Sequence, residues 1–222
     1  MGEPRRRVRE DAAAKVAPTT LEGERVRLEP FDASAHEQAL YESLHDDAGD
    51  PRLWDYLPYG PFTREEWHEW FAASCASRDP LFFALLVDGV QLGQASYLRI
   101  EPEHGVIEIG HIALGPELQR TPAATEATYL LARHAFDDLG YRRLEWKCDA
   151  LNARSRRAAE RLGFTFEGIF RQHMIVKGRN RDSAWFSIID REWPERRAAF
   201  EAWLDPANFD ATGRQLKPLR EV

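Results

Sequence analysis

The sequence predicts a single mixed α/β (α+β) domain, in which a central sheet of about six to seven strands carries helices on both faces. The chain has 222 residues, of which 43% are hydrophobic and 11% aromatic, enough to bury one substantial core. Segments with the period-two alternation of strands are interspersed with segments that have helical spacing. No repeat or break in composition divides the chain, so one layered domain is expected.

The antiparallel part of the sheet is predicted by a hairpin. The apolar run 81–87 reads as a buried strand, and Asp88-Gly89 is a pair typical of a two-residue turn. A second strand is expected at 90–100 and a third at 106–114. These three runs predict three neighbouring antiparallel strands.

A helix is predicted at 122–139, and both of its ends are marked. Thr121 is a suitable N-cap, Pro122 stands at the first helical position, and Gly140 follows the last turn. The helix therefore begins directly after the third antiparallel strand and a short bend.

The same criteria predict the remaining strands, near 25–28 and 144–148 and at 164–176 and 183–189. They also predict helices after Asp32 or Ser34, after Thr63 with Glu66 as a capping box, after Asn152, and around Trp193. A turn is expected at 177–182. We expect residues 1–19 to form a poorly ordered N-terminal tail, residues 20–204 the domain, and residues 205–222 a C-terminal tail.

Composition argues against several classes of function. With 30 basic and 37 acidic side chains the formal charge is −7, which disfavours a general electrostatic hold on nucleic acid. No apolar run is long enough to span a membrane or to form a signal peptide. Cys75 and Cys148 lie far apart, and the seven histidines are scattered, so neither a disulfide nor a metal site is expected. A cytoplasmic protein fits best, as a monomer or a homodimer.

The strand, bend and helix from Val106 to Asp138 have the character of an anion site. The first turn of a helix offers free N–H groups and the positive end of its dipole, which together bind phosphate. Ala123, Ala124 and Thr125 are small enough for a pyrophosphate to approach the backbone.

At this point the chain resembles the GNAT acetyltransferases, in particular the branch typified by ribosomal-protein N-terminal acetyltransferases. The family's cofactor loop, Gln/Arg-x-x-Gly-x-Gly/Ala, is matched here by Gln119, Arg120, Thr121, Pro122, Ala123 and Ala124. The resemblance implies a GNAT fold, with this loop on the pyrophosphate of acetyl-CoA and the strand Ile112, Ala113 and Leu114 along the pantetheine arm. Pro122 replaces the central glycine and removes one N–H donor, a loss that Arg120 is hypothesised to offset.

A second match is more specific. Residues 152–164 resemble the family's Asn-x-x-Ser helix that ends in Leu-Gly-Phe, and a third match follows from Phe166 to Trp193. The resemblance implies that Asn152 helps to hold the cofactor and that Ser155 protonates the departing thiolate. Between residues 142 and 161, seven basic and three acidic side chains give a local balance of +4, so Arg157 is also expected near the phosphates.

The resemblance implies an N-acetyltransferase in which the amine attacks acetyl-CoA directly within a ternary complex. A general base must then take a proton from the amine, and Glu108, whose pKa would rise beside an apolar pocket, is the first candidate. His173 is the next. His111 lies on the opposite face of the strand from Glu108 unless a bulge intervenes. Each residue also has a structural interpretation, as a strand carboxylate paired with an arginine or as an ordinary core histidine.

Trp54, Tyr56 and Tyr59, in an aromatic loop, are predicted to form a wall for the acceptor together with Glu108. The acceptor is either a small amine or the N-terminal amine of a protein. The acidic residues near this loop, which hint at a cationic partner, are Glu42, Asp46, Asp47, Asp50 and Asp55. The alternatives are a non-catalytic CoA-binding module and a scaffold.

Overall fold

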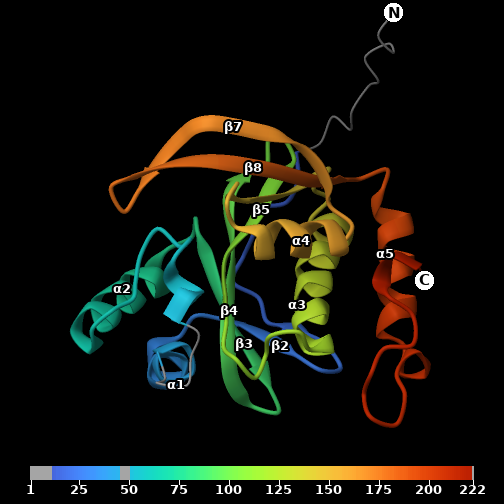
Figure 1. Cartoon of the computed structure of the whole chain (residues 1–222), viewed down its shortest axis with the longest axis horizontal. Coiled ribbons are helices and arrows are strands. Elements are labelled where there is room, and N and C mark those ends of the chain that lie inside the picture. The colour runs from blue at the N-terminus through green and yellow to red at the C-terminus, as the bar shows by residue number, and fades with distance from the viewer. Residues whose placement is uncertain (1–11, 46–50, 222) are drawn as a thin grey trace, which may run out of the picture.

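The computed structural model describes residues 12–45 and 51–221, and it contains one eight-stranded sheet with the order β1-β2-β3-β4-β5-β6-β8-β7 (Figure 1). The strands are β1 Leu21–Glu22, β2 Arg27–Pro30, β3 Leu81–Val87, β4 Val90–Glu101, β5 Val106–Leu114, β6 Arg143–Asp149, β7 Thr165–Val176 and β8 Arg179–Ile189. The mixed sheet is confirmed, with one strand more than expected. The two-residue β1 is too short to show an alternation in the sequence.

Helices cover both faces of the sheet, as expected (Figure 1). The helices are α1 Ala33–His45, α2 Arg64–Ala76, α3 Pro122–Arg133, α4 Ala153–Arg161 and α5 Trp193–Leu204, with short helical segments η1 Pro51–Trp54, η2 His134–Asp138, η3 Pro206–Asn208 and η4 Leu219–Glu221. Helices α1 and α2 lie on one side of the sheet, and α3, α4 and α5 lie on the other. The final turn of the predicted 122–139 helix is the π-helical segment η2. None of the described helices has both the length and the apolar character needed to cross a bilayer.

Strand β3 divides its side chains between two cores. Phe83 and Leu85 belong to the cluster that packs against α3 and α5, whereas Phe82, Ala84 and Leu86 belong to the cluster beneath α1 and α2. Since successive strand residues point to opposite faces, a continuous apolar run is required when both faces are covered. This explains why 81–87 shows no alternation.

The predicted caps are present. Thr63 and Glu66 form the expected capping box of α2. Asp32, rather than Ser34, caps α1, because its carboxylate accepts the N–H groups of Ser34 and Ala35. Thr121 caps α3 by accepting the N–H of Ala124, with Pro122 in the first turn.

The turn expected at 177–182 is shorter in the structure, where only Lys177 and Gly178 connect β7 to β8. Residues 179–182 are strongly polar and give no strand signal, yet Arg179 and Arg181 pair with Val176 and Met174 of β7. The correction places Arg181 on a strand that faces the functional site.

Both ends of the described chain pack on the domain. The N–H groups of Ala13 and Ala14 bond the carbonyls of Pro102 and Leu139. Beyond α5, the Asn208 amide bonds the carbonyls of Trp203 and Lys217, and Leu219 is buried. The division of the chain into a domain and two tails stays a prediction.

A single carboxylate holds the loop before β2 against α3. Glu126 is buried and accepts the N–H groups of Glu24, Arg25 and Val26 at 3.2, 2.6 and 2.9 Å. Glu126→Ala would leave these donors without their acceptor, so we expect a loss of about 3 kcal/mol in the free energy of unfolding, measured by urea denaturation. Glu195→Ala, at an exposed position on α5, is the control and should change it by less than about 0.5 kcal/mol. Equal midpoints for both variants would contradict this account of the loop.

Strands β5 and β6 separate part of the way along their length. They pair in parallel from Val106 with Arg143 to Ile109 with Trp146, and in the described chain no later pair joins them. β5 nevertheless continues to Leu114 and β6 to Asp149. The opening between the diverging ends exposes one backbone edge of β5, and the candidate site lies there.

Candidate functional site

Two cavities meet where β5 and β6 diverge. The larger is a groove of about 990 Å³, and the smaller is a cavity of about 190 Å³. They share seven lining residues, which are Leu53, Tyr56, Ile109, Ile112, Trp146, Asn152 and Ser155. The two spaces are therefore neighbours across one common wall.

Most of the predicted cofactor residues line the larger groove: Ile112, Leu114, Gln119, Arg120, Thr121, Ala124, Thr125, Asn152, Ser155 and Arg157. Ala113 and Ala123 do not, because their side chains are buried in the two cores. Any contact that these two residues make with a ligand in the groove would come from their backbone.

The groove is rich in cations. Six arginines line it against one carboxylate, that of Asp55, and they are Arg52, Arg120, Arg154, Arg157, Arg161 and Arg214. Arg161 donates to the Thr125 hydroxyl at 3.0 Å and lies over the Trp203 ring. Burial lowers the pKa of this guanidinium. An anionic ligand would gain from this charge in an otherwise acidic protein.

The sequence assigns a role to two of these arginines, Arg120 and Arg157, and misses the other four. Arg154 and Arg161 enter only the local charge balance, Arg52 has no assigned role, and Arg214 lies in the segment predicted to be a C-terminal tail. Phe209, Gly213 and Gln215 line the groove beside Arg214. The polar composition of 205–222 contains no pattern that would have indicated this wall.

Pro122 lines the groove at the first turn of α3, where the Thr121 hydroxyl already accepts the Ala124 N–H at 3.2 Å. Restoring an N–H with Pro122→Gly is expected to tighten acetyl-CoA binding about three- to tenfold, the contribution of one hydrogen bond, as measured by calorimetry. Pro122→Ala is the matched variant, since it adds the same N–H without the flexibility of glycine. If neither variant binds more tightly, the proline costs no affinity and Arg120 has nothing to offset.

The smaller cavity contains the predicted base. Glu108 is 2% exposed, and its Oε2 lies 3.4 Å from Lys147 Nζ and 3.4 Å from Arg99 Nε. Burial raises the pKa of Glu108, and the two cations oppose that rise. The carboxylate thus has ion-pair partners, as the structural interpretation expected, and also lines the cavity, as the catalytic one requires.

A β-bulge brings His111 into the same cavity as Glu108. Ser96 pairs with Gly110 and Gln94 with Ala113, so β5 has one residue more than β4 here, and His111 has a φ of 50°. Simple alternation, which would place the two side chains on opposite faces, therefore does not hold. His111 Nδ1 lies 3.0 Å from the Tyr59 hydroxyl, and burial lowers its pKa to about 4. The imidazole is consequently neutral at pH 7.

His173 is not among the residues that line either cavity. Its Nδ1 lies 2.9 Å from the hydroxyl of Ser183, and its ring packs near Trp185. Its role as an alternative base stays a prediction without a supporting contact.

The three predicted wall residues have different positions. Tyr56 lines both cavities, and its hydroxyl donates to the Leu151 carbonyl at 3.3 Å. Tyr59 reaches the cavity only through its contact with His111, and burial raises its pKa. Trp54 is buried and stacks on His45, so its side chain belongs to the core beneath α1 and α2. Asp46, Asp47 and Asp50 of the acidic cluster lie outside the described residues.

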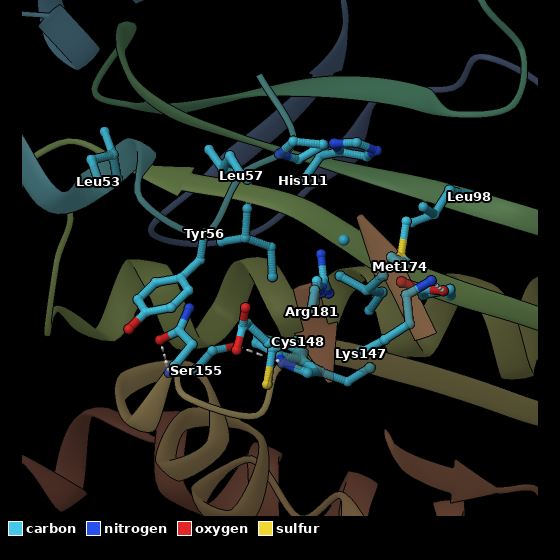
Figure 2. A pocket seen from close by; sticks show the side chains of 18 residues that line it. Leu53, Tyr56, Leu57, Leu98, His111, Lys147, Cys148, Ser155, Met174 and Arg181 are labelled. Carbon is cyan, nitrogen blue, oxygen red and sulfur yellow. Dashed lines mark hydrogen bonds and ion pairs between the residues drawn. The ribbon is translucent and has the colours of Figure 1, made fainter. Parts of the chain in front are cut away.

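Ser155 stands at the junction of the two cavities. Its backbone N–H donates to Asn152 Oδ1 at 3.0 Å, which caps α4, and its hydroxyl oxygen accepts the indole N–H of Trp146 at 2.9 Å. Since the oxygen already accepts, the hydroxyl can donate its own proton. Figure 2 shows the smaller cavity with Tyr56 and Ser155 on one side, Leu98, Met174 and Lys147 on the other, and Arg181 between them.

No group of three or more His, Cys, Asp or Glu side chains within 12–45 and 51–221 is arranged to hold a metal ion.

Solved structures of known proteins share this fold. A GCN5-related N-acetyltransferase from Brucella melitensis superposes with a TM-score of 0.91 at 48% identity, over 95% of this chain and 96% of that one. A GNAT-family structure from Chromobacterium violaceum follows, with a TM-score of 0.81 and 40% identity over 87% of this chain and 98% of that one.

Among curated proteins, YdaF of Bacillus subtilis, named for a proposed ribosomal N-acetyltransferase activity, is 31% identical over 109 residues. That match covers 49% of this chain and 59% of the length of YdaF, so it spans less than two thirds of the relative. Residues 25–165 match the family model described as an acetyltransferase (GNAT) domain. The chain belongs to the GNAT acetyltransferase family.

Proposed function

We propose that the protein transfers an acetyl group from acetyl-CoA to a primary amine, by direct attack within a ternary complex. The observation that carries the proposal is the pair of adjoining cavities with Ser155 in their common wall. Bound acetyl-CoA would supply an activated acyl group at that wall. The residues of the chain would then bind both reactants, move a proton from the amine and return one to the leaving thiolate.

The larger groove suits coenzyme A in charge and in backbone geometry. Its arginines outnumber its carboxylate by six to one; Arg120 lies in the loop just before the first turn of α3, and Arg161 donates to Thr125 near the start of that helix. Beyond Ile109 the edge of β5 is no longer paired with β6, which leaves backbone groups of Ile112 and Leu114 to hold an extended arm. These residues would hold the cofactor.

Glu108 is proposed to receive the proton of the amine. A carboxylate whose pKa is raised by burial accepts a proton more readily than an exposed one, and the neighbouring Lys147 favours the charged form that can accept it. His111, neutral and in the same cavity, is the alternative acceptor of that proton.

Ser155 is proposed to protonate the leaving thiolate. The Trp146 indole N–H holds the hydroxyl oxygen from one side, so the hydroxyl retains a proton that it can donate, and the Cys148 thiol is its other neighbour. A thiolate is a better leaving group when a donor neutralises the charge that develops on sulfur.

The test is to incubate the purified protein with acetyl-CoA and a panel of amines and to follow the release of free thiol. The panel includes small amines and short peptides with a free N-terminus, the latter suggested by the name of YdaF. Thiol release that depends on an amine supports the proposal. Acetyl-CoA binding without release on any amine would favour a non-catalytic CoA-binding module, and the absence of both would favour a scaffold.

A further inference from the structure

Arg181 has an unusual environment for a charged side chain. It is 8% exposed and lines the smaller cavity, and its Nε has no hydrogen-bond partner. Within the described part of the chain, no carboxylate lies within ion-pair distance of its guanidinium. A buried charge without a partner is costly, and natural proteins usually pair it or keep it for a ligand.

The carboxylates of the smaller cavity are already engaged. Glu108 faces Lys147 and Arg99, and Asp149 accepts the N–H of Leu151 at 2.8 Å. Lys147 also lies over the Trp185 ring. Arg181 is thus a cation that remains available in this cavity, in the space between Tyr56 and Ser155 on one side and Met174 on the other (Figure 2).

The position of Arg181 follows from the hairpin of β7 and β8. It pairs with Met174 in register, and both side chains line the cavity. Glu108 and Ser155 line the same space of about 190 Å³. A small molecule within it would therefore meet a carboxylate, a hydroxyl and a free guanidinium at once.

We propose that the acceptor amine carries a carboxylate near its amino group, and that Arg181 binds this carboxylate while the amine faces Glu108 and Ser155. The inference rests on the proposed acetyl transfer and specifies its acceptor class. A guanidinium binds a carboxylate through two parallel N–H···O bonds, which would also orient the amine. The acceptor is then an amino acid, or a peptide with an acidic side chain next to its N-terminus, and not the polycation that the acidic cluster before the aromatic loop suggested.

The experiment compares matched acceptors. Free α-amino acids are paired with their amides, and peptides with Asp or Glu at the first or second position are paired with the Asn or Gln peptides. The wild-type protein is expected to have a kcat/KM at least about tenfold higher for the member with the carboxylate, the effect of one charged hydrogen-bonded pair. Preference in the first set identifies a free amino acid, and preference in the second set identifies a peptide.

Arg181→Met should abolish this preference, and Arg181→Lys should retain part of it because the charge remains. Arg179→Met is the matched control, since Arg179 lies two residues away on the same strand, is exposed, and does not line either cavity. Calorimetry gives a readout apart from turnover: in the presence of CoA, the preferred acceptor should bind Arg181→Met at least about tenfold more weakly than the wild type.

Equal use of both members of each pair by the wild-type protein would overturn the proposal, and this comparison needs no variant to fold. So would an unchanged preference in Arg181→Met. Thiol release with amides and acids alike would leave acetyl transfer in place and remove only the role of Arg181. Absence of release with every amine would instead contradict the proposed function.

Discussion

Glu108→Gln is expected to lower kcat/KM for the acceptor amine by at least about 100-fold, the usual contribution of a general base. Glutamine keeps the size and polarity of the side chain but cannot receive the proton. The loss should be smaller at high pH, where more of the amine is already neutral. The measurement is thiol release across a pH series, with the acceptor at subsaturating concentration.

Glu145→Gln is a close control for this change. Glu145 pairs with Glu108 in the β5–β6 register, is buried, and has Arg143 and Arg99 as ion-pair partners, but it does not line either cavity. It should retain activity within a few-fold of the wild type if its fold is intact. A similar loss in both variants would indicate damage to the buried charge network and not the removal of a base.

The pH profile distinguishes Glu108 from His111. A base must be deprotonated to act, so activity falls as the pH drops through its pKa. Burial raises the pKa of Glu108 above its ordinary 4.5, so with Glu108 as the base the acid limb of the kcat/KM profile lies at a higher pH. With His111 as the base, its pKa of about 4 would place that limb at a lower pH. Retained activity in Glu108→Gln with an unmoved limb would transfer the role to His111.

Ser155→Ala is expected to lower kcat about 10- to 100-fold while the dissociation constant of acetyl-CoA changes by less than about threefold. The hydroxyl is needed only when charge develops on the leaving sulfur, so its loss affects the transition state more than the bound complex. Thiol release at saturating substrates gives kcat, and calorimetry gives the affinity.

Ser155→Thr is the matched variant, because it keeps a hydroxyl that can accept the Trp146 indole N–H. It should retain more activity than the alanine variant. An unchanged kcat in Ser155→Ala would remove the assignment, and a loss of affinity equal to the loss of kcat would reduce Ser155 to a binding residue.

Much of the fold could be predicted from the sequence because its signals are local. The turn at Asp88 and Gly89, the capping box of Thr63 and Glu66, and the proline start of α3 depend on residues that are neighbours along the chain. The early start of β8 could not be predicted, since residues 179–182 are polar and acquire strand structure only by pairing with β7. Tertiary pairing overrode the local composition there.

The residues of the candidate site also fall into two groups, those that a local sequence motif marks and those that only the tertiary structure brings to the site. The residues of the groove that follow a motif, such as Arg120 and Ser155, could be named because the motif is contiguous. The position of His111 depends on one inserted residue in β5, which breaks the alternation on which its assignment to the opposite face relied. Arg181 and Arg214 are brought to the site by the hairpin and by the segment after α5, and no local pattern marks them.

The wall formed by Phe209, Gly213 and Arg214 has a consequence for the order in which the protein acquires its function. The family model ends at residue 165, and the motifs that identify the family end at Trp193, the first residue of α5. During synthesis the nascent chain therefore contains all of these motifs while its groove still lacks one side. The groove becomes complete only after residues 206–215 have followed from the ribosome, so a chain that stops at Asp205 would be recognised as a family member and yet hold a groove open at one end.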